Sequence, residues 1–288
     1  MRRGGAIALR RATHATSPAA STPFACSSRE LHSTADVPQT AKVSPSSRWL
    51  SDIKNRIGYC ITFGLKPAQT VEAGSILDEI SRDWRELLAG SEGYLTDKKR
   101  LSMLRRPVAW GDMDSMGHVN NTIYNRYAET GRIEWASKYA RYIDPAHAEE
   151  WRSLWLPVGE GLLLRKITTE YKFPMKYPDH ITVYHRLASK PLEGTDTFDM
   201  HAIIISELHQ RTAAKVVEDC VLYDYRTAKK TPLQPWMLEV LQETWRLQEE
   251  AKRINSERVV GILDRVRKLE AESWDRADAV EDMGVASK

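Results

Sequence analysis

One stretch of the sequence, Trp110-Gly-Asp-Met-Asp-Ser-Met-Gly-His-Val-Asn-Asn-Thr-Ile-Tyr124, decides the fold, because it joins two segments of different character. The run that leads into it, residues 104–110, is short and predicts a β-strand. The segment that leaves it, residues 120–142, places aromatic and small residues along one face and predicts an amphipathic α-helix. Asn120 or Asn121 can supply the oxygen that caps this helix, so the stretch is a strand-to-helix turn.

Four strand-like runs follow the long helix and predict its partner in the fold. They are separated by proline, glycine and polar residues that are typical of turns. The runs are residues 162–173, 181–189, 197–209 and 213–225. One strand, one long helix and four successive strands predict an α+β domain, in which a single antiparallel sheet carries the helix against it.

Helical segments flank this centre on both sides. Residues 48–65 and 67–88 are predicted helices, and residues 231–279 are predicted to form one long helix or two, with charges of alternating sign typical of a solvated face. The chain therefore divides into five parts with different expected roles. They are a leader (1–38), a linker (39–47), an N-terminal helical extension (48–100), the α+β domain (101–230) and a C-terminal helical extension with a disordered tail (231–288).

Composition excludes several classes of protein. Hydrophobic residues make up 42% of the chain, enough for a packed core, and the net charge of +3 (42 basic minus 39 acidic residues) is too small for a dedicated nucleic-acid binder. The three cysteines contain no CxxC pair and the histidines lack metal-ligand spacing, so we expect neither a disulfide framework nor a metal site. The longest apolar runs fall well below the roughly 18 residues of a membrane span.

The first residues have the composition of a mitochondrial transit peptide. Residues 1–29 hold five arginines and no acidic residue, with serine, threonine and alanine between them. Such a segment is drawn inward by the membrane potential, so we expect a mitochondrial matrix protein whose mature chain begins between Leu31 and Gln39. N-terminal sequencing of the protein from mitochondria tests this, because a chain beginning at Met1 would contradict it.

Five residues of the turn are candidates for chemistry: Asp112, Asp114, His118, Asn120 and Asn121. A carboxylate near a helix start stays ionised and can act as nucleophile or general base, while free backbone N–H groups there can hold a developing oxyanion. Acyl transfer to water requires such a set of groups. The same residue types also cap helices and brace turns, so the residues alone leave both interpretations open.

The turn and its helix resemble the signature of the hotdog-fold thioesterases of the 4-hydroxybenzoyl-CoA thioesterase type. That signature runs aromatic-Gly/Ser-Asp-x-Asp-x-x-Gly-His-Val-Asn-Asn-x-x-Tyr, followed by Tyr, Glu and Arg on the helix. The residues that fit it here are Trp110, Gly111, Asp112, Asp114, Gly117, His118, Val119, Asn120, Asn121, Tyr124, Tyr127, Glu129 and Arg132. The resemblance covers residues 104–225, and the helical extensions are similar to those of fungal mitochondrial members of the family.

The resemblance implies a role for each part of the turn. It makes Asp114 the catalytic carboxylate and places His118 in the site, whereas Met116 stands where related plant acyl-carrier-protein thioesterases have a catalytic Asn. We expect Asp112 to brace the turn, and Glu129 and Arg132 to form a helix-surface or dimer-interface pair. The residues expected to bind substrate or to hold the oxyanion, unless they only cap the helix, are Gly117, Val119, Asn120, Asn121 and Tyr124.

The resemblance also implies an activity and an assembly. It implies a hotdog-fold hydrolase that cleaves a fatty or aromatic acyl thioester of CoA or acyl-carrier protein, with no cofactor beyond the CoA of the substrate, acting as a homodimer or higher homo-oligomer. The alternative is a non-catalytic hotdog subunit of a matrix assembly, which the long terminal helices and Met116 favour. A basic cluster at residues 98–100 and 105–106 either steers a CoA 3′-phosphate or an acidic carrier protein, or is a solvated linker.

Overall fold

The computed structural model describes residues 48–282. The predicted leader (1–38) and linker (39–47) lie outside the described residues, so the matrix location stays a prediction. Within the described range, no helix is both long enough and apolar enough to cross a membrane.

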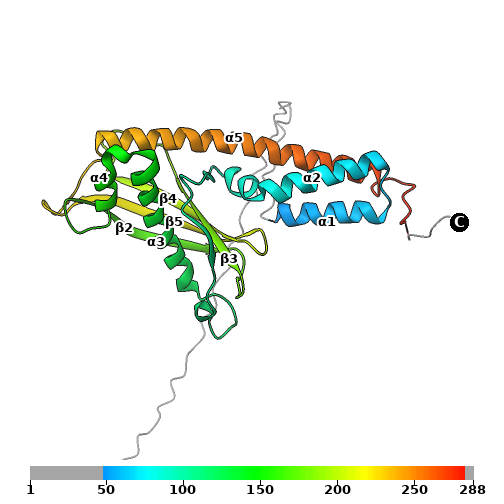
Figure 1. Ribbon diagram of the computed structural model, residues 1–288, viewed down its shortest axis with the longest axis horizontal. Coiled ribbons are helices and arrows are strands. Elements are labelled where there is room, and N and C mark those ends of the chain that lie inside the picture. Colours follow the sequence, from blue (N-terminus) through cyan, green and yellow to red (C-terminus); the bar gives the residue numbers. More distant parts are fainter. Residues whose placement is uncertain (1–47, 283–288) are drawn as a thin grey trace, which may run out of the picture. The chain divides into compact units, whose positions relative to one another are not determined.

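An antiparallel sheet forms the centre of the described part (Figure 1). Its strands follow the order β1-β3-β4-β5-β2, so that β1 and β2 lie at the two edges, and the short β6 pairs with β5. The strands are β1 (Met103–Pro107), β2 (Glu160–Tyr171), β3 (His180–Leu187), β4 (Thr197–Ser206), β5 (Arg211–Asp224) and β6 (Lys229–Lys230). The predicted antiparallel sheet is therefore confirmed.

The long central helix, α3 (Asn121–Lys138), lies against one face of the sheet and contacts all five strands from β1 to β5. Tyr124, Tyr127 and Ala128 of α3 pack in one buried cluster with Val183 of β3 and Ile204 of β4. A sheet that wraps a long helix in this way is the hotdog fold, as the family resemblance implied. A π-helical turn (Tyr139–Ile143) and α4 (Ala148–Ser153) continue the chain after α3.

The N-terminal helical segment packs on part of the opposite face of the sheet. It comprises α1 (Trp49–Thr62) and α2 (Pro67–Arg85), which extend beyond the sheet beside the C-terminal helix in Figure 1, and a π-helical turn (Glu86–Gly90). Because successive side chains of a strand point to opposite faces, Tyr184 of β3 and Ile203 and Ile205 of β4 face these helices while their neighbours face α3. The N-terminal extension is therefore part of the packed core.

The C-terminal extension is a single helix, α5 (Pro235–Glu272), where the sequence allowed one helix or two. Its first half packs Met237 and Leu241 in a cluster with residues of α3, α4 and the sheet. Its second half packs Val259 and Ile262 with α1 and α2. One helix thus contacts both the sheet domain and the N-terminal helices, as its course across Figure 1 shows.

Candidate active site

Backbone hydrogen bonds hold residues 108–120 in a compact loop between β1 and α3. Asp114 N donates to the carbonyl of His118 over 2.8 Å, and Met113 and Val119 form an antiparallel bridge beside it. Gly117 closes this turn with a φ of +75°, a conformation that a residue with a Cβ adopts only under strain. The sequence therefore folds the two aspartates and His118 into one small region at the start of α3.

The Asp114 carboxylate is bound on one oxygen and open on the other. Its Oδ1 accepts hydrogen bonds from the backbone N–H groups of Met116 (2.8 Å) and His118 (3.4 Å). Its Oδ2 has no hydrogen-bond donor within residues 48–282, and the side chain is partly exposed. The His118 imidazole is also partly exposed and shares no hydrogen bond with Asp114. The structure thus brings the two predicted residues together through the backbone and holds a partly exposed carboxylate with one oxygen free of donors in the described residues.

Asp112 has its carboxylate occupied inside the loop. Its Oδ2 accepts a hydrogen bond from Ala109 N (3.0 Å) and another from the Tyr127 hydroxyl (2.7 Å), and its carbonyl accepts Asn120 N (2.9 Å). Burial and the neighbouring Asp112 carboxylate raise the pKa of Tyr127, which keeps its hydroxyl protonated as the donor. These bonds tie the loop to α3, as expected of a bracing residue.

Most of the N–H groups that could hold an oxyanion already have acceptors. Gly117 N donates to Asp114 O (3.1 Å), and Val119 N donates to Met175 O (2.9 Å). The side chains of Val119 and Met175 are both buried. Asn120 caps α3, because its Oδ1 accepts Thr122 N over 2.9 Å. Among the N–H groups of residues 117–121, that of Asn121 alone has no acceptor in the described part of the chain. The oxyanion role expected of this group of residues is therefore left to Asn121.

Tyr124 supports the fold beneath the site. It is buried, its hydroxyl accepts Met175 N over 3.2 Å, and its ring meets the Tyr171 ring edge-on at 5.2 Å. Burial raises the pKa of Tyr124, which keeps this hydroxyl neutral. The Tyr124 hydroxyl therefore positions the segment that accepts the Val119 N–H.

The predicted pair of Glu129 and Arg132, at the helix surface or at a dimer interface, is wrong. Glu129 is exposed, whereas Arg132 is buried and binds the fully buried Glu218 of β5. The other oxygen of Glu218 lies 3.3 Å from His185 Nε2, at ion-pair distance but without hydrogen-bond alignment. His185 Nδ1 in turn shares a hydrogen bond of 2.7 Å with Ser102 Oγ. This buried network joins α3, β3, β5 and the start of β1.

Two polar residues at core-facing strand positions indicate this network in the sequence, although the sequence-based expectations did not include it. Glu218 occupies a core-facing position of its strand, in register with the buried Val216 and Cys220, and His185 alternates in the same way with Val183 and Leu187. A carboxylate and an imidazole at core positions must find partners, because an unpaired buried charge is costly. Arg132, on the buried face of the neighbouring helix, supplies that partner.

Exposed apolar side chains stand on both sides of Asp114. Trp110 is 77% exposed and Met116 is 80% exposed, although large apolar side chains usually avoid water. Such a rim is typical of a surface that meets a ligand or another protein. Among residues 48–282, no three histidine, cysteine, aspartate or glutamate side chains are grouped so as to hold a metal ion.

Comparisons with known proteins relate this part of the chain to one superfamily. Residues 108–241 match the family model of the thioesterase-like superfamily, a segment that holds the loop, α3, the strands β2 to β6 and the first turns of α5. No curated protein matches the chain.

Two solved structures illustrate the similarity. A thioesterase from Thermus thermophilus, complexed with coenzyme A and Zn, is 20% identical, covers 54% of this chain and 98% of its own, and gives a TM-score of 0.39. A DHNA-CoA thioesterase from Staphylococcus aureus is 17% identical, covers 52% of this chain and 94% of its own, and gives a TM-score of 0.41.

Proposed function

We propose that this protein hydrolyses acyl-CoA thioesters to a free acid and CoA, with Asp114 as the catalytic carboxylate. The observation that carries the proposal is the state of that partly exposed side chain: two N–H groups fix one oxygen, and the other oxygen has no donor within residues 48–282. The match of residues 108–241 to the thioesterase-like superfamily supports the class of reaction.

The arrangement supports two routes for the reaction. In the first, the free oxygen of Asp114 attacks the thioester carbonyl carbon, the C–S bond breaks, the thiolate leaves, and water then hydrolyses the mixed anhydride. In the second, the same oxygen takes a proton from the water molecule that attacks the carbonyl carbon. Either way negative charge develops on the carbonyl oxygen, and the unpaired N–H of Asn121 at the positive end of α3 is suited to receive it.

The role proposed for His118 is to orient the thioester or to polarise its carbonyl. Its imidazole is partly exposed beside Asp114 and shares no hydrogen bond with the carboxylate, so it does not complete a base-nucleophile pair. We therefore expect replacement of His118 by alanine to cost less activity than neutralisation of Asp114.

Asp114→Asn tests the proposal, with Asp112→Asn as its matched control. Asparagine keeps the size of the side chain and an oxygen for the two N–H groups, but it removes the negative charge and most of the basicity. We expect turnover of a panel of acyl-CoA substrates to fall by roughly 10²- to 10⁴-fold in Asp114→Asn. Asp112→Asn should retain most activity, because its amide oxygen can still accept the bonds that brace the loop.

Two results would contradict this proposal. One is near-normal hydrolysis by Asp114→Asn together with inactive Asp112→Asn. The other is a folded wild-type protein that hydrolyses no acyl-CoA above background. The second result would favour a non-catalytic hotdog subunit, an alternative supported by α1, α2 and most of α5, which lie outside the segment that matches the superfamily.

We further propose that the protein is a homodimer. The edge strand β2 spans twelve residues and leaves its outer side unpaired in the described part of the chain. An unpaired edge of this length is a ready surface for a second strand. The exposed Trp110 and Met116 would then lie near the contact, together with residues 117–121.

A further inference from the structure

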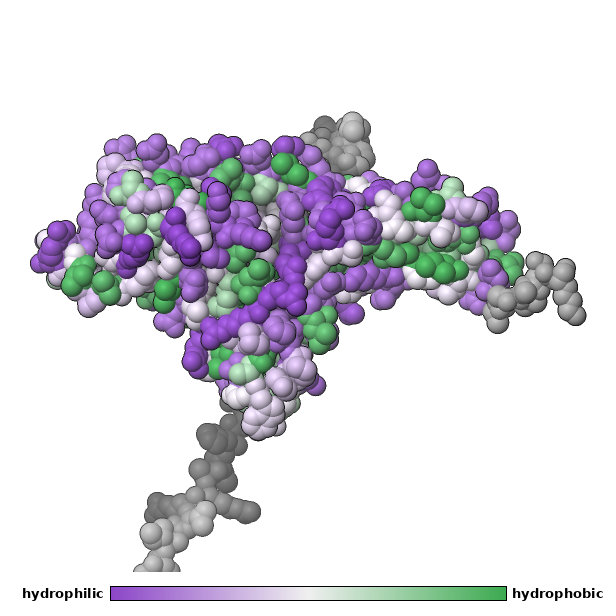
Figure 2. All heavy atoms as spheres, viewed as in Figure 1, coloured by the Kyte–Doolittle hydropathy of each residue, from purple (hydrophilic) through white to green (hydrophobic). Residues whose placement is uncertain are grey.

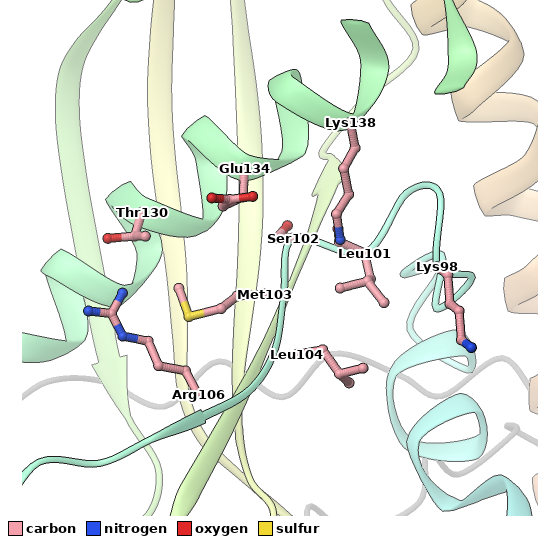
Figure 3. A pocket seen from close by; sticks show the side chains of 9 residues that line it. All are labelled: Lys98, Leu101, Ser102, Met103, Leu104, Arg106, Thr130, Glu134 and Lys138. Carbon is pink, nitrogen blue, oxygen red and sulfur yellow. The ribbon is translucent and has the colours of Figure 1, made fainter. Parts of the chain in front are cut away.

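A pocket of about 400 Å³ opens between α3 and β1 (Figure 3). Glu134 and Lys138 project into it from α3, Leu104 and Arg106 come from β1, and Lys98 lies at one end on the preceding segment. Its volume is within the range of small-molecule sites in proteins, which is roughly 300–1,000 Å³. We call this feature the α3–β1 groove.

The charges of the groove favour an anion. Three cations, Lys98, Arg106 and Lys138, line it, against the single carboxylate of Glu134. Within residues 48–282, none of the three cations forms an ion pair with a carboxylate. The Lys138 ammonium donates instead to the carbonyl of Leu101 over 2.8 Å, and burial lowers its pKa, so a bound anion would stabilise its charged form. Figure 2 shows hydrophilic side chains across the middle of the visible face.

Hydrogen bonds to neighbouring elements fix the segment that leads into β1, on one side of the groove. Ser102, the residue before β1, is fixed to His185 by the 2.7 Å hydrogen bond, and Lys138 ties α3 to Leu101. The register of β1 on β3 shifts between Met103 and Arg106, and Arg105 takes a φ of +50° within that irregularity. Arg105 lines a different pocket, beside Glu207, while Arg106 lines the groove.

The groove is lined by β1 and α3, the two elements that flank the loop of the candidate active site. Arg106 lies two residues before the start of the loop at Val108, and Thr130 lies nine residues along α3 from Asn121. Nine residues of helix span roughly 14 Å, at 1.5 Å per residue. A ligand with its reacting carbonyl at Asp114 can therefore extend its other end along α3 into the groove.

We propose that the α3–β1 groove binds the nucleotide phosphates of CoA, and so distinguishes CoA thioesters from thioesters that lack phosphate. This inference rests on the proposed thioesterase function and adds a specificity site to it. Arg106 suits a phosphate because its planar guanidinium can donate two parallel hydrogen bonds, and Lys138 adds a point charge. Leu104, 47% exposed, offers apolar surface for the base or the pantetheine arm.

The neighbouring arginines provide a matched pair of variants. Arg106→Gln and Arg105→Gln each remove one positive charge from β1, but only the first removes it from the groove. We expect Arg106→Gln to raise KM for an acyl-CoA about 3- to 10-fold, which corresponds to the loss of a partly exposed charged contact, with little change in kcat. KM for the same acyl group on N-acetylcysteamine, which carries no phosphate, should be unchanged in both variants.

A gain of affinity provides a stricter test, because a damaged structure does not produce one. Glu134→Gln removes the carboxylate of the groove, so calorimetry with CoA itself should show a Kd about 2- to 5-fold lower than that of the wild type. The Kd should also rise with salt, since exposed charges are screened. These measurements need no turnover, so they test the groove even if the thioesterase proposal fails.

Three outcomes would overturn the inference. The first is a wild-type protein that does not bind CoA. The second is equal binding of CoA by Arg105→Gln and Arg106→Gln, which would reduce the effect to net charge. The third is a defect of Arg106→Gln confined to acyl-carrier-protein substrates, which would assign the cations to a carrier protein. Equal thermal midpoints for the two variants serve as the folding control.

Discussion

The buried pair of Arg132 and Glu218 predicts a large and pH-dependent loss of stability when one partner is removed. Arg132→Met keeps the length and apolar contacts of the side chain but leaves a carboxylate with no exposed surface beside His185 alone. Breaking a buried pair in this way costs about 3–5 kcal/mol. For a folded unit of this size 1 kcal/mol shifts Tm by roughly 2–4 °C, so we expect Tm to fall by about 10 °C at pH 7.

The pH dependence of that loss follows from the carboxyl group. Burial alone would raise the pKa of Glu218, but His185 and Arg132 outweigh it and hold the pKa below its ordinary value of 4.5. A lowered pKa stabilises the folded state above pH 4.5, and this stabilisation is lost as the pH falls below that value. The difference in the free energy of unfolding between wild type and Arg132→Met should therefore have its largest value at pH 7 and decrease below pH 4.5.

Urea unfolding from pH 7 down to about pH 3 provides the assay, and the double variant Arg132→Met/Glu218→Met provides the control. Because the double variant removes both charges, it should recover most of the stability lost by the single one. A loss below about 1 kcal/mol for Arg132→Met at pH 7, or a double variant less stable than the single one, would refute the reasoning.

Two further predictions concern packing and assembly. A Cβ at Gly131 would lie 2.8 Å from His185 Cε1 and 3.0 Å from Val183 Cγ1, so Gly131→Ala should destabilise the protein by about 1–3 kcal/mol in urea unfolding. Gly74→Ala, where a Cβ meets open space in α2, should be neutral or stabilising by up to about 1 kcal/mol, and a loss there would argue against this contrast. Sedimentation at micromolar concentration should give about twice the 32.9 kDa chain mass, and a monomer would contradict pairing through β2.

The sequence predicted the elements of the sheet domain because their signals are local. The glycine and asparagine turn, the 3.6-residue pattern of the central helix and the alternation of the strands each depend on neighbours within about ten residues. The cap at Asn120 and the bracing role of Asp112 were likewise readable, since both act across a few positions.

Contacts between distant segments could not be predicted in the same way. Arg132 and Glu129 look like a surface pair on one helix, and only the packing of α3 on β5 shows that Arg132 belongs with Glu218. Which of Arg105 and Arg106 lines the groove depends on the register of β1 on β3, which shifts between Met103 and Arg106 and which no residue type in the sequence marks. Which N–H groups of the loop stay unpaired also depends on a distant partner, the carbonyl of Met175.

The helices α1, α2 and α5 extend the region that must fold as one unit beyond the segment that matches the superfamily. The segment that matches the thioesterase-like superfamily spans residues 108–241, yet α5 continues to Glu272, and its second half belongs to the same buried cluster as the N-terminal helices, Tyr184, Ile203 and Ile205. A fragment cut to the matching segment would expose these three side chains to water. The segment that matches the superfamily is therefore smaller than the region that must fold together, and the helices occupy part of a sheet face that the matching segment alone would leave open to water.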